Sequence, residues 1–261
     1  MKNSYLGVYF LCLIVGLLTV KQVVAEDTVR LTSGEWAPFL SEQIADYGIA
    51  SRIVTEAFSA VNIKVVYGFF PWKRSYRYAL LGEDEEGKQW HGTPGWILTE
   101  KRVEDFFISG VIFQADAVFF HLKTFPFVWN DLQDLRGLTI GLPDSATYPT
   151  LENAERRGIV SVERGGSYRS VFKKLLYSDI NLVPQIREVG YYYLNNHFPE
   201  NERERITSFK KVIQSRLYHL LLSKRHPENE KRIEAFNNGM KIIINNGLYE
   251  TIYQDLKQYE N

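Results

Sequence analysis

Residues 47–69 of the chain read YGIASRIVTEAFSAVNIKVVYGF, and this stretch combines the two local patterns on which the fold depends. Apolar side chains recur every four positions from Ile49 to Val61, which predicts a helix over residues 47–60. Residues 63–69 are rich in β-branched and aromatic types and end just before Pro71, which predicts a strand. A helix followed at once by a strand indicates an α/β arrangement.

The same alternation extends in both directions. A strand is expected at residues 29–32, and a helix over residues 72–81 is expected to end at Gly82. The further elements expected are strands at 118–122, 138–142, 160–163, 182–183 and 218–222, and helices at 148–157, 168–177 with Ser167 as N-cap, and 227–246 before Gly247. Strands that alternate with helices predict an α/β fold in three layers.

The chain begins with the features of a secretory signal peptide. Lys2 supplies a positive charge, an uncharged apolar run covers residues 6–20, and residues 23–25 (Val-Val-Ala) place small side chains at a cleavage site. The run is shorter than the ~20 residues of a spanning helix, which disfavours a membrane anchor. Cys12 lies inside the run, which disfavours a lipoprotein. We therefore expect cleavage after Ala25 and a soluble periplasmic product.

Removal of residues 1–25 changes the charge balance and the chemistry available. It takes Lys2 and Lys21 from the 31 basic residues and leaves 29 against 31 acidic ones, which gives no reason to expect a nucleic-acid partner. It also removes Cys12, the single cysteine, and with it any disulfide, thiolate nucleophile or zinc–thiolate site. The five histidines are not spaced as a metal pair, and no nucleophile-elbow or phosphate-loop motif occurs. We expect no cofactor, no metal and no catalytic residues.

Several stretches of the mature chain occur in the order found in one known family. They are Gly34-Glu-Trp-Ala-Pro-Phe39, Phe70-Pro-Trp-Lys-Arg74, Trp96-Ile-Leu-Thr-Glu-Lys-Arg102 with Phe107-Ile-Ser109, Asp134-Leu-Arg-Gly-Leu-Thr-Ile-Gly141, and Ser145-Ala-Thr147. Together, behind a signal peptide, they make the chain resemble the periplasmic solute-binding proteins of polar amino-acid uptake (bacterial extracellular solute-binding protein family 3).

The resemblance implies a two-lobed periplasmic-binding-protein-like fold of type II, in which two α/β lobes are joined by two hinge strands. On that template lobe 1 comprises residues 26–119 and 216–261, and lobe 2 comprises residues 120–215. The two hinge crossings are then expected at residues 118–122 and 218–222. A ligand would lie in the cleft, and the lobes would close over it.

The resemblance also assigns candidate ligand contacts. Arg102 matches the family's carboxylate-binding arginine, and a guanidinium can pair with a carboxylate through two parallel bonds, although a solvated surface arginine is the alternative. Ser145 and Thr147 precede an expected helix, where they can either donate to the same carboxylate or act only as an N-cap. The chain is expected to be a monomer.

Aromatic residues at the ends of the first strands are further candidates. Trp36, Phe39 and Trp72 follow strand ends, where α/β sheets place their ligand crevices, and Trp72 matches a family position that covers the ligand. Packing in the core is the alternative for each of them.

One position departs from the family. Relatives that bind amino acids carry an Asp for the ligand's ammonium where this chain has Ile186. Because a buried ammonium without an acidic partner is costly, either Glu35 or Glu188 substitutes, or the ligand lacks an α-ammonium group.

Three functions follow from these observations. The first is a binding protein that captures a small polar ligand, with an amino acid favoured, for a membrane ABC transporter permease. The second is a periplasmic sensor for a membrane receptor. The third is a small lyase, a dehydratase, on the same fold. We favour the first and expect that the chain is not an enzyme and that no catalytic or kinase domain is attached to it.

Overall fold

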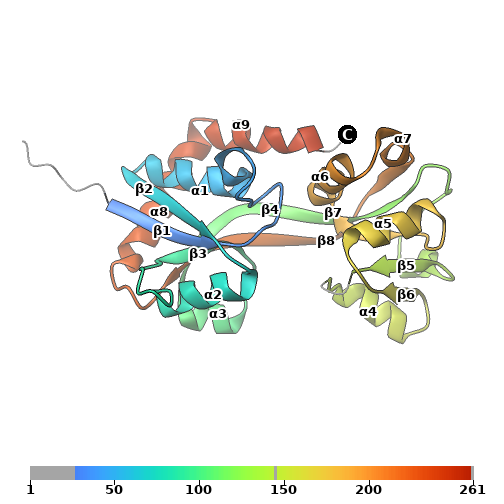
Figure 1. The fold of residues 1–261 in the computed structure, drawn as a ribbon, viewed down its shortest axis with the longest axis horizontal. Coiled ribbons are helices and arrows are strands. Elements are labelled where there is room, and N and C mark those ends of the chain that lie inside the picture. The colour runs from blue at the N-terminus through green and yellow to red at the C-terminus, as the bar shows by residue number, and fades with distance from the viewer. Residues whose placement is uncertain (1–26, 144–145, 260–261) are drawn as a thin grey trace, which may run out of the picture.

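The structure is a computed structural model that describes residues 27–143 and 146–259, and in it the chain forms two lobes joined by two long strands (Figure 1). The expected signal peptide, its cleavage site after Ala25 and the candidate ligand residue Ser145 lie outside the described residues. None of the helices in the described ranges is long and apolar enough to cross a membrane.

Residues from both ends of the described chain build lobe 1. Its elements are β1 (Asp27–Ser33), η1 (Ala45–Tyr47), α1 (Ile49–Ser59), β2 (Ile63–Phe69), α2 (Trp72–Leu81), β3 (Gly92–Trp96), α3 (Glu100–Asp105), α8 (Asn229–Asn245), α9 (Leu248–Gln254) and η3 (Asp255–Tyr259). The strand expected at 63–69 and the helix expected at 72–81 have the predicted bounds. Gly82 ends α2 with φ +82°, a conformation that glycine adopts without strain.

The core of lobe 1 lies where α1 and α8 meet one face of the sheet. β1 pairs in parallel with β2 along its whole length, and α1 buries its apolar stripe, including Ile53 and Ala57, beneath these strands. Gly239 of α8 faces α1 at a point where a Cβ atom would stand 1.8 Å from the carbonyl oxygen of Ala57. The glycine therefore allows the two helices to approach closely.

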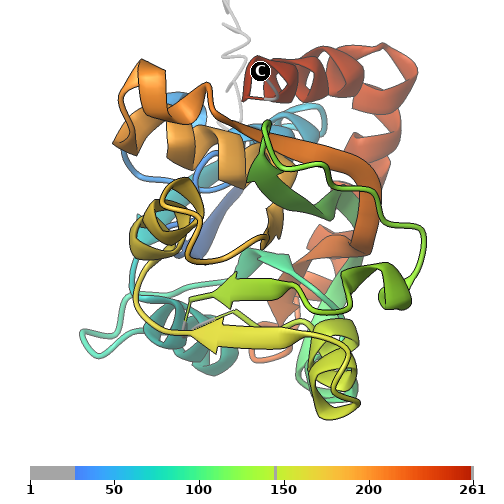
Figure 2. The same cartoon turned by 90° about the vertical axis from the view of Figure 1, so that its right-hand side faces the viewer.

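The middle of the chain builds lobe 2. Its elements are η2 (Leu132–Leu135), β5 (Thr139–Leu142), α4 (Pro149–Arg156), β6 (Ser161–Arg164), α5 (Tyr168–Leu176), β7 (Val183–Ile186), α6 (Arg187–His197) and α7 (Glu200–Arg203). β5 and β6 form a parallel pair, seen face-on in Figure 2, and two clusters of buried apolar side chains hold the helices against the strands.

Two strands, β4 (Phe106–Leu122) and β8 (Ile206–Ser223), run through both lobes and pair with each other in antiparallel fashion. They sit in a sheet with the order β2-β1-β3-β8-β4-β7. The strands expected from the sequence, at 118–122 and 218–222, cover only the last part of each. Register shifts between Ile108 and Val111 and between Ala117 and Val118 break the period-two pattern that would have marked their full length.

The packing along β4 locates the passage from one lobe to the other. Phe113 and Ala115 belong to the lobe 1 core, whereas Ala117 and Phe119 belong to a lobe 2 core. We therefore propose that β4 crosses near residue 116 and β8 near residue 215, so that the crossing in β4 lies about three residues before the expected 119/120 boundary. A further contact between the lobes is made by Tyr259 of η3, whose ring centroid lies 5.4 Å from that of Tyr192 in α6.

Candidate ligand-binding site

A cavity of about 260 Å³ lies where the two lobes meet. Its lining comes from lobe 1, from lobe 2 and from the strands that connect them, as expected for a site closed by lobe movement. The lining residues are Trp36, Ala115, Ala117, Ala146, Thr147, Tyr148, Tyr168, Gln185, Ile186, Gln214, Arg216 and Tyr218.

The floor of the cavity is made by residues that face one another across the connecting strands. Ala115 of β4 pairs with Arg216 of β8, and Ala117 pairs with Gln214. Because successive side chains of a strand point to opposite faces, these four lie on one face of the ribbon. The small alanines leave room above the floor, and the longer polar side chains of β8 enter it.

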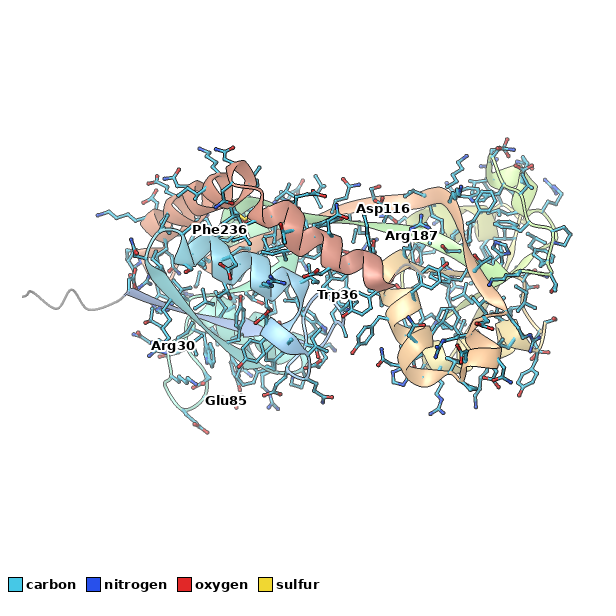
Figure 3. All side chains as sticks on the ribbon, turned by 90° about the horizontal axis from the view of Figure 1, so that it is seen from above. Arg30, Trp36, Glu85, Asp116, Arg187 and Phe236 are labelled. Atoms are coloured by element: carbon cyan, nitrogen blue, oxygen red, sulfur yellow. The ribbon has the colours of Figure 1, made fainter. Side chains whose placement is uncertain are left out.

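The intervening residues occupy the other face. Asp116 accepts a hydrogen bond from the hydroxyl of Ser215 at 2.6 Å, and it does not line the cavity. Asp116 lies on the connecting strand between the lobes (Figure 3). The alternation therefore places a carboxylate on one face of the ribbon and a guanidinium on the other.

Arg216 is oriented by its neighbour. With the amide of Gln214 turned so that both groups are satisfied, its oxygen accepts from Nε of Arg216 at 2.8 Å and from Nη2 at 3.2 Å. None of the ion pairs found in the described ranges involves Arg216. The guanidinium is thus held in place at the cavity floor by a neutral amide.

Aromatic rings form the lobe 1 side of the cavity. The ring of Trp36 lies 4.9 Å from Tyr218 and 4.9 Å from Phe39, and Tyr218 stacks on Phe113 with planes 9° apart. Trp36 lies on the side of lobe 1 that faces lobe 2 (Figure 3). These contacts fix the indole at the edge of the core, where it also lines the cavity.

The lobe 2 side presents the hydroxyl groups of buried Tyr148 and half-buried Tyr168. Tyr148 donates to the carbonyl oxygen of Pro184 at 3.2 Å. Burial raises the pKa of Tyr168 to about 12, partly opposed by hydrogen bonds with Tyr148 and Gln185, and burial likewise raises the pKa of Tyr148 well above its usual value. Both phenols therefore stay protonated and neutral at physiological pH.

A second recess of about 330 Å³ adjoins the cavity and shares Gln214 and Arg216 with it. Its other lining residues are Ile97, Leu98, Leu217 and His219. Leu98 is 46% exposed, so apolar surface of this recess is open to solvent. Arg216 therefore lines both a cavity with aromatic side chains and a recess with aliphatic ones.

Of the residues predicted from the sequence, Trp36 and Thr147 line the cavity. Thr147 is exposed, and Tyr148 takes the N-cap position of α4, so the alternative role of Thr147 as a simple N-cap is not observed.

Arg102 lies beside the site but is held by lobe 1. Its Nη1 donates to the carbonyl oxygen of Ile97 at 2.7 Å, and its guanidinium carbon stands 4.6 Å from the ring centroid of Trp96. Arg102 is not among the described residues that line either recess. Its assignment as the carboxylate-binding residue stays a prediction.

The remaining lobe 1 candidates make structural contacts. Nε1 of Trp72 donates to the backbone oxygen of Glu35 at 3.1 Å, and its ring covers Gly34. The carboxylate of Glu35 accepts from the backbone N–H of Glu42 at 2.8 Å. Phe39 is fully buried, so the core alternative holds for this residue.

Ile186 lines the cavity at the position where amino-acid-binding relatives carry an Asp. It pairs with Ala117 and so continues the floor from β8 through β4 to β7. Neither Glu35 nor the buried Glu188 is among the lining residues in the described part of the chain. The candidate substitutes for the Asp therefore do not reach the cavity in this structure.

Sequence reasoning missed Gln185, Gln214, Arg216, Tyr168 and Tyr218. The signal that could have found Arg216 and Gln214 is their spacing of two in a strand, but the register shifts in β4 and β8 hide the length of that strand. Gln185 lies next to Ile186 in β7, but the sequence predicts a strand only at residues 182–183 and so does not place Gln185 in it.

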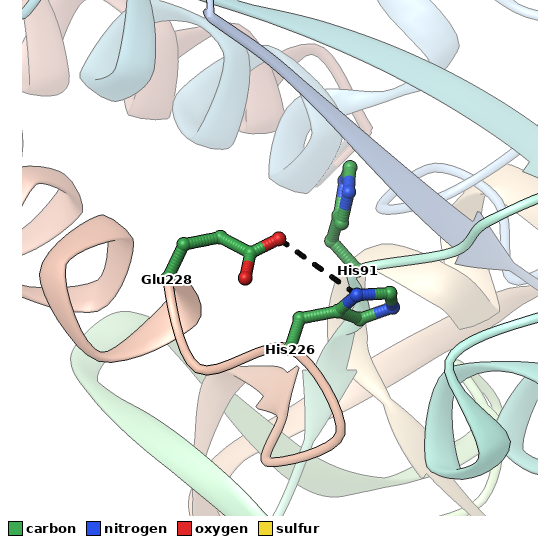
Figure 4. Close-up of side chains that lie close together, drawn as sticks. All are labelled: His91, His226 and Glu228. Atoms are coloured by element: carbon green, nitrogen blue, oxygen red, sulfur yellow. Dashed lines mark ion pairs between the residues drawn. The ribbon is translucent and has the colours of Figure 1, made fainter.

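Outside the cavity, His91, His226 and Glu228 place their side chains together in lobe 1, with ligand atoms within 4.8 Å of one another (Figure 4). Nδ1 of His91 accepts from the backbone N–H of Arg30 at 2.9 Å, which leaves a proton on its Nε2. Nε2 of His226 lies 2.9 Å from the carbonyl oxygen of Gly82 and must donate to it. The backbone thus fixes both tautomers, and His91 has no free nitrogen lone pair for a metal.

No protein-family model and no curated protein sequence matches the chain. Among solved structures, it is similar to a domain described as the second substrate-binding domain of an amino acid ABC transporter from Streptococcus pneumoniae, with 17% identity, a TM-score of 0.67, and coverage of 87% of this chain and 98% of that one. It is also similar to substrate-binding domain 2 of GlnP from Lactococcus lactis in the open conformation, with 19% identity, a TM-score of 0.66, and coverage of 90% and 96%.

A third similar structure is a histidine kinase sensor domain with similarity to periplasmic binding proteins, at 15% identity, a TM-score of 0.62, and coverage of 88% of this chain and 96% of that one. At these identities the likeness establishes the fold. The two-lobed α/β periplasmic-binding-protein fold that the sequence predicts is confirmed.

Proposed function

We propose that this chain is a secreted solute-binding protein, which captures a small polar ligand between its lobes and presents it to a membrane ABC transporter. The observation that carries the proposal is the cavity floor, where Ala115 pairs with Arg216 across the two connecting strands. A site built on the hinge strands and walled by both lobes changes shape whenever the lobes move, so occupancy and lobe angle are coupled.

The lining supports binding rather than catalysis. Arg216, Gln214 and Gln185 offer fixed hydrogen-bonding groups, and the aromatic rings offer contact area, as in ordinary small-molecule sites. Among the described residues that line the first cavity there is no carboxylate or histidine to act as a general acid or base. His219 lines the second recess, where its Nδ1 lies 2.9 Å from the carbonyl oxygen of Ser109.

A sensor role uses the same capture step, and the likeness to a histidine kinase sensor domain favours it as the second candidate. Uptake measurements separate the two. Loss of labelled-ligand uptake in cells that lack this chain supports transport. Unchanged uptake, with loss of a ligand-dependent response, supports sensing.

The capture step is tested by a thermal-shift screen of amino acids, small carboxylates and amines, followed by X-ray scattering with each ligand that stabilises the chain. A ligand that binds only the folded state adds about 2.7 kcal/mol at a hundredfold excess over its Kd. We expect at least one such ligand and a smaller radius of gyration in its presence.

A pair of variants ties the result to the cavity. Ala117→Trp fills the floor and should abolish the thermal shift, whereas Asp116→Asn, one residue away on the other face of β4, should bind like the wild type. A stabilising ligand that leaves the radius of gyration unchanged would contradict lobe closure, and a screen without any stabilising ligand would contradict the binding role.

A further inference from the structure

The charges around the cavity are unbalanced. Among the described lining residues Arg216 is the one with a formal charge, and it takes part in none of the ion pairs found there. Gln214 satisfies two of its donors without neutralising it. A partly buried guanidinium held by a neutral amide favours an anionic ligand, and a carboxylate matches its planar fork.

The described residues that line the cavity include no carboxylate that could pair with an ammonium group. Ile186 lies beside Ala117 in the floor and can neither accept a hydrogen bond nor balance a positive charge. The carboxylate of Glu35 already accepts from the backbone of Glu42 on the exposed surface. An amino acid bound here would bury its ammonium near isoleucine and in the same cavity as a guanidinium, and both neighbours oppose that charge.

The walls indicate what accompanies the anionic group. The first cavity, which Arg216 lines, also holds Trp36 and the tyrosine rings, whose hydroxyls stay neutral because burial raises their pKa values. The second recess, which Arg216 also lines, presents Ile97 and Leu98. Rings and aliphatic surface beside a single cation fit a ligand with one acidic end and an apolar body.

From these three observations we propose that the ligand is a small carboxylate without an ammonium group, whose acidic end pairs with Arg216 and whose aromatic or aliphatic body lies against the walls. The inference rests on the proposed function, because it assumes that the interlobe cavity is the capture site. It assigns Ile186 a role in specificity, as the residue that excludes α-amino acids.

Matched pairs of ligands that differ only at the amino position test the inference. Calorimetric titrations of the wild type with phenylpyruvate against L-phenylalanine, and with 4-methyl-2-oxopentanoate against L-leucine, compare acids of the same size and shape. We expect the deaminated member to bind at least about tenfold more tightly in at least one pair. In Arg216→Gln that affinity should fall on the order of thirtyfold or more, because a buried charge partner is lost.

The converse test is a gain of function. Ile186→Asp should weaken binding of the deaminated acid and allow the amino acid to bind. Ile186→Asn is the control, because asparagine has the shape of aspartate without its charge, and this variant should not bind the amino acid. Circular dichroism and a thermal melt confirm that each variant is folded before titration.

The outcomes are distinguishable from failure of the proposed function. Wild-type protein that prefers the amino acid in every pair, or that binds only amines, overturns the inference and leaves the capture function standing. An absence of binding to every acid, amino acid and amine overturns both.

Discussion

Arg102 donates a hydrogen bond from Nη1 to the carbonyl oxygen of Ile97 at 2.7 Å, and the same guanidinium covers the ring of Trp96. We expect Arg102→Ala to lower the free energy of unfolding by about 1–2 kcal/mol, because both contacts are lost. Urea unfolding measures the change. Glu104→Ala, at an exposed position of the same helix, is the control and should change stability by less than about 0.5 kcal/mol.

The family resemblance makes Arg102 the partner of the ligand's carboxylate. To bind it, the guanidinium must either divide its hydrogen bonds between the ligand and the carbonyl oxygen of Ile97 or give up its bond to Ile97. Arg216 already faces the cavity. We therefore expect Arg102→Lys to reduce ligand affinity less than Arg216→Gln does. The reverse order in calorimetric titrations would place the carboxylate on Arg102 and would favour the resemblance over the cavity geometry.

Trp36 gives the cavity an optical signal. Of the chain's five tryptophans, Trp36 is the one that lines the cavity. Contact with a ligand should therefore change its fluorescence emission. In Trp36→Phe we expect most of the ligand-induced fluorescence change to disappear, because phenylalanine keeps the packing on Tyr218 and removes the indole. Trp129→Phe, a substitution in the lobe 2 core, should retain the change. A full signal in Trp36→Phe would place the ligand elsewhere.

The elements that the sequence predicts well are those set by neighbours along the chain. α1 follows from the period of its apolar residues, and Gly82 marks the end of α2 because it adopts a positive φ there. β2 follows from a segment rich in β-branched and aromatic residues before a proline. Each of these signals acts within a few residues, so it can be read without knowledge of the fold.

The site depends on contacts that local patterns do not encode. Arg216 enters the cavity because β8 pairs with β4, a strand far away in the sequence, in a register that sets it opposite Ala115. The resemblance to the family points to Arg102, in the stretch from Trp96 to Arg102, whereas Arg216 stands in a segment with no motif. The cavity also takes hydroxyls from Tyr148 and Tyr168, which are brought together only by the lobe 2 fold.

Export is tested at the N-terminus. The charged start, the apolar run and residues 23–25 predict that the mature chain begins at Glu26. N-terminal sequencing of protein from a periplasmic extract should therefore start with Glu-Asp-Thr-Val. Replacement of Ala25 by a bulky residue such as Trp should block processing and leave a longer, membrane-associated species. Intact Met1 on the wild-type protein in the membrane fraction would contradict cleavage.

Gly239 sets the distance between α8 and α1. A glycine-to-alanine change inside a helix ordinarily stabilises it by about 0.5–1 kcal/mol. Here the added methyl would stand 1.8 Å from the carbonyl oxygen of Ala57, so the helices must separate. We expect Gly239→Ala to lower the free energy of unfolding by about 1–3 kcal/mol. Asn238→Ala, at the preceding position of α8, is the control. An increase in stability for Gly239→Ala would contradict the close packing.

Nδ1 of buried His91 accepts from the backbone N–H of Arg30, and burial, assisted by the charge of Arg232, lowers the pKa of this histidine to about 4. An unfolded histidine titrates near 6.5. Between about pH 6.5 and pH 4 the unfolded chain therefore binds a proton that the folded chain refuses, so His91 makes the fold progressively less stable as the pH falls through this window.

The loss attributable to His91 should approach roughly 3 kcal/mol near pH 4. His91→Asn can place its Oδ1 as an acceptor for Arg30 while removing the titration, so its stability should fall less than that of the wild type over the same range. Asn195→Ala, which changes an exposed residue of α6 that does not titrate, should keep the wild-type pH dependence. Urea unfolding at half-unit steps from pH 7 to pH 4 gives the three curves, and parallel curves for wild type and His91→Asn would contradict the low pKa of His91.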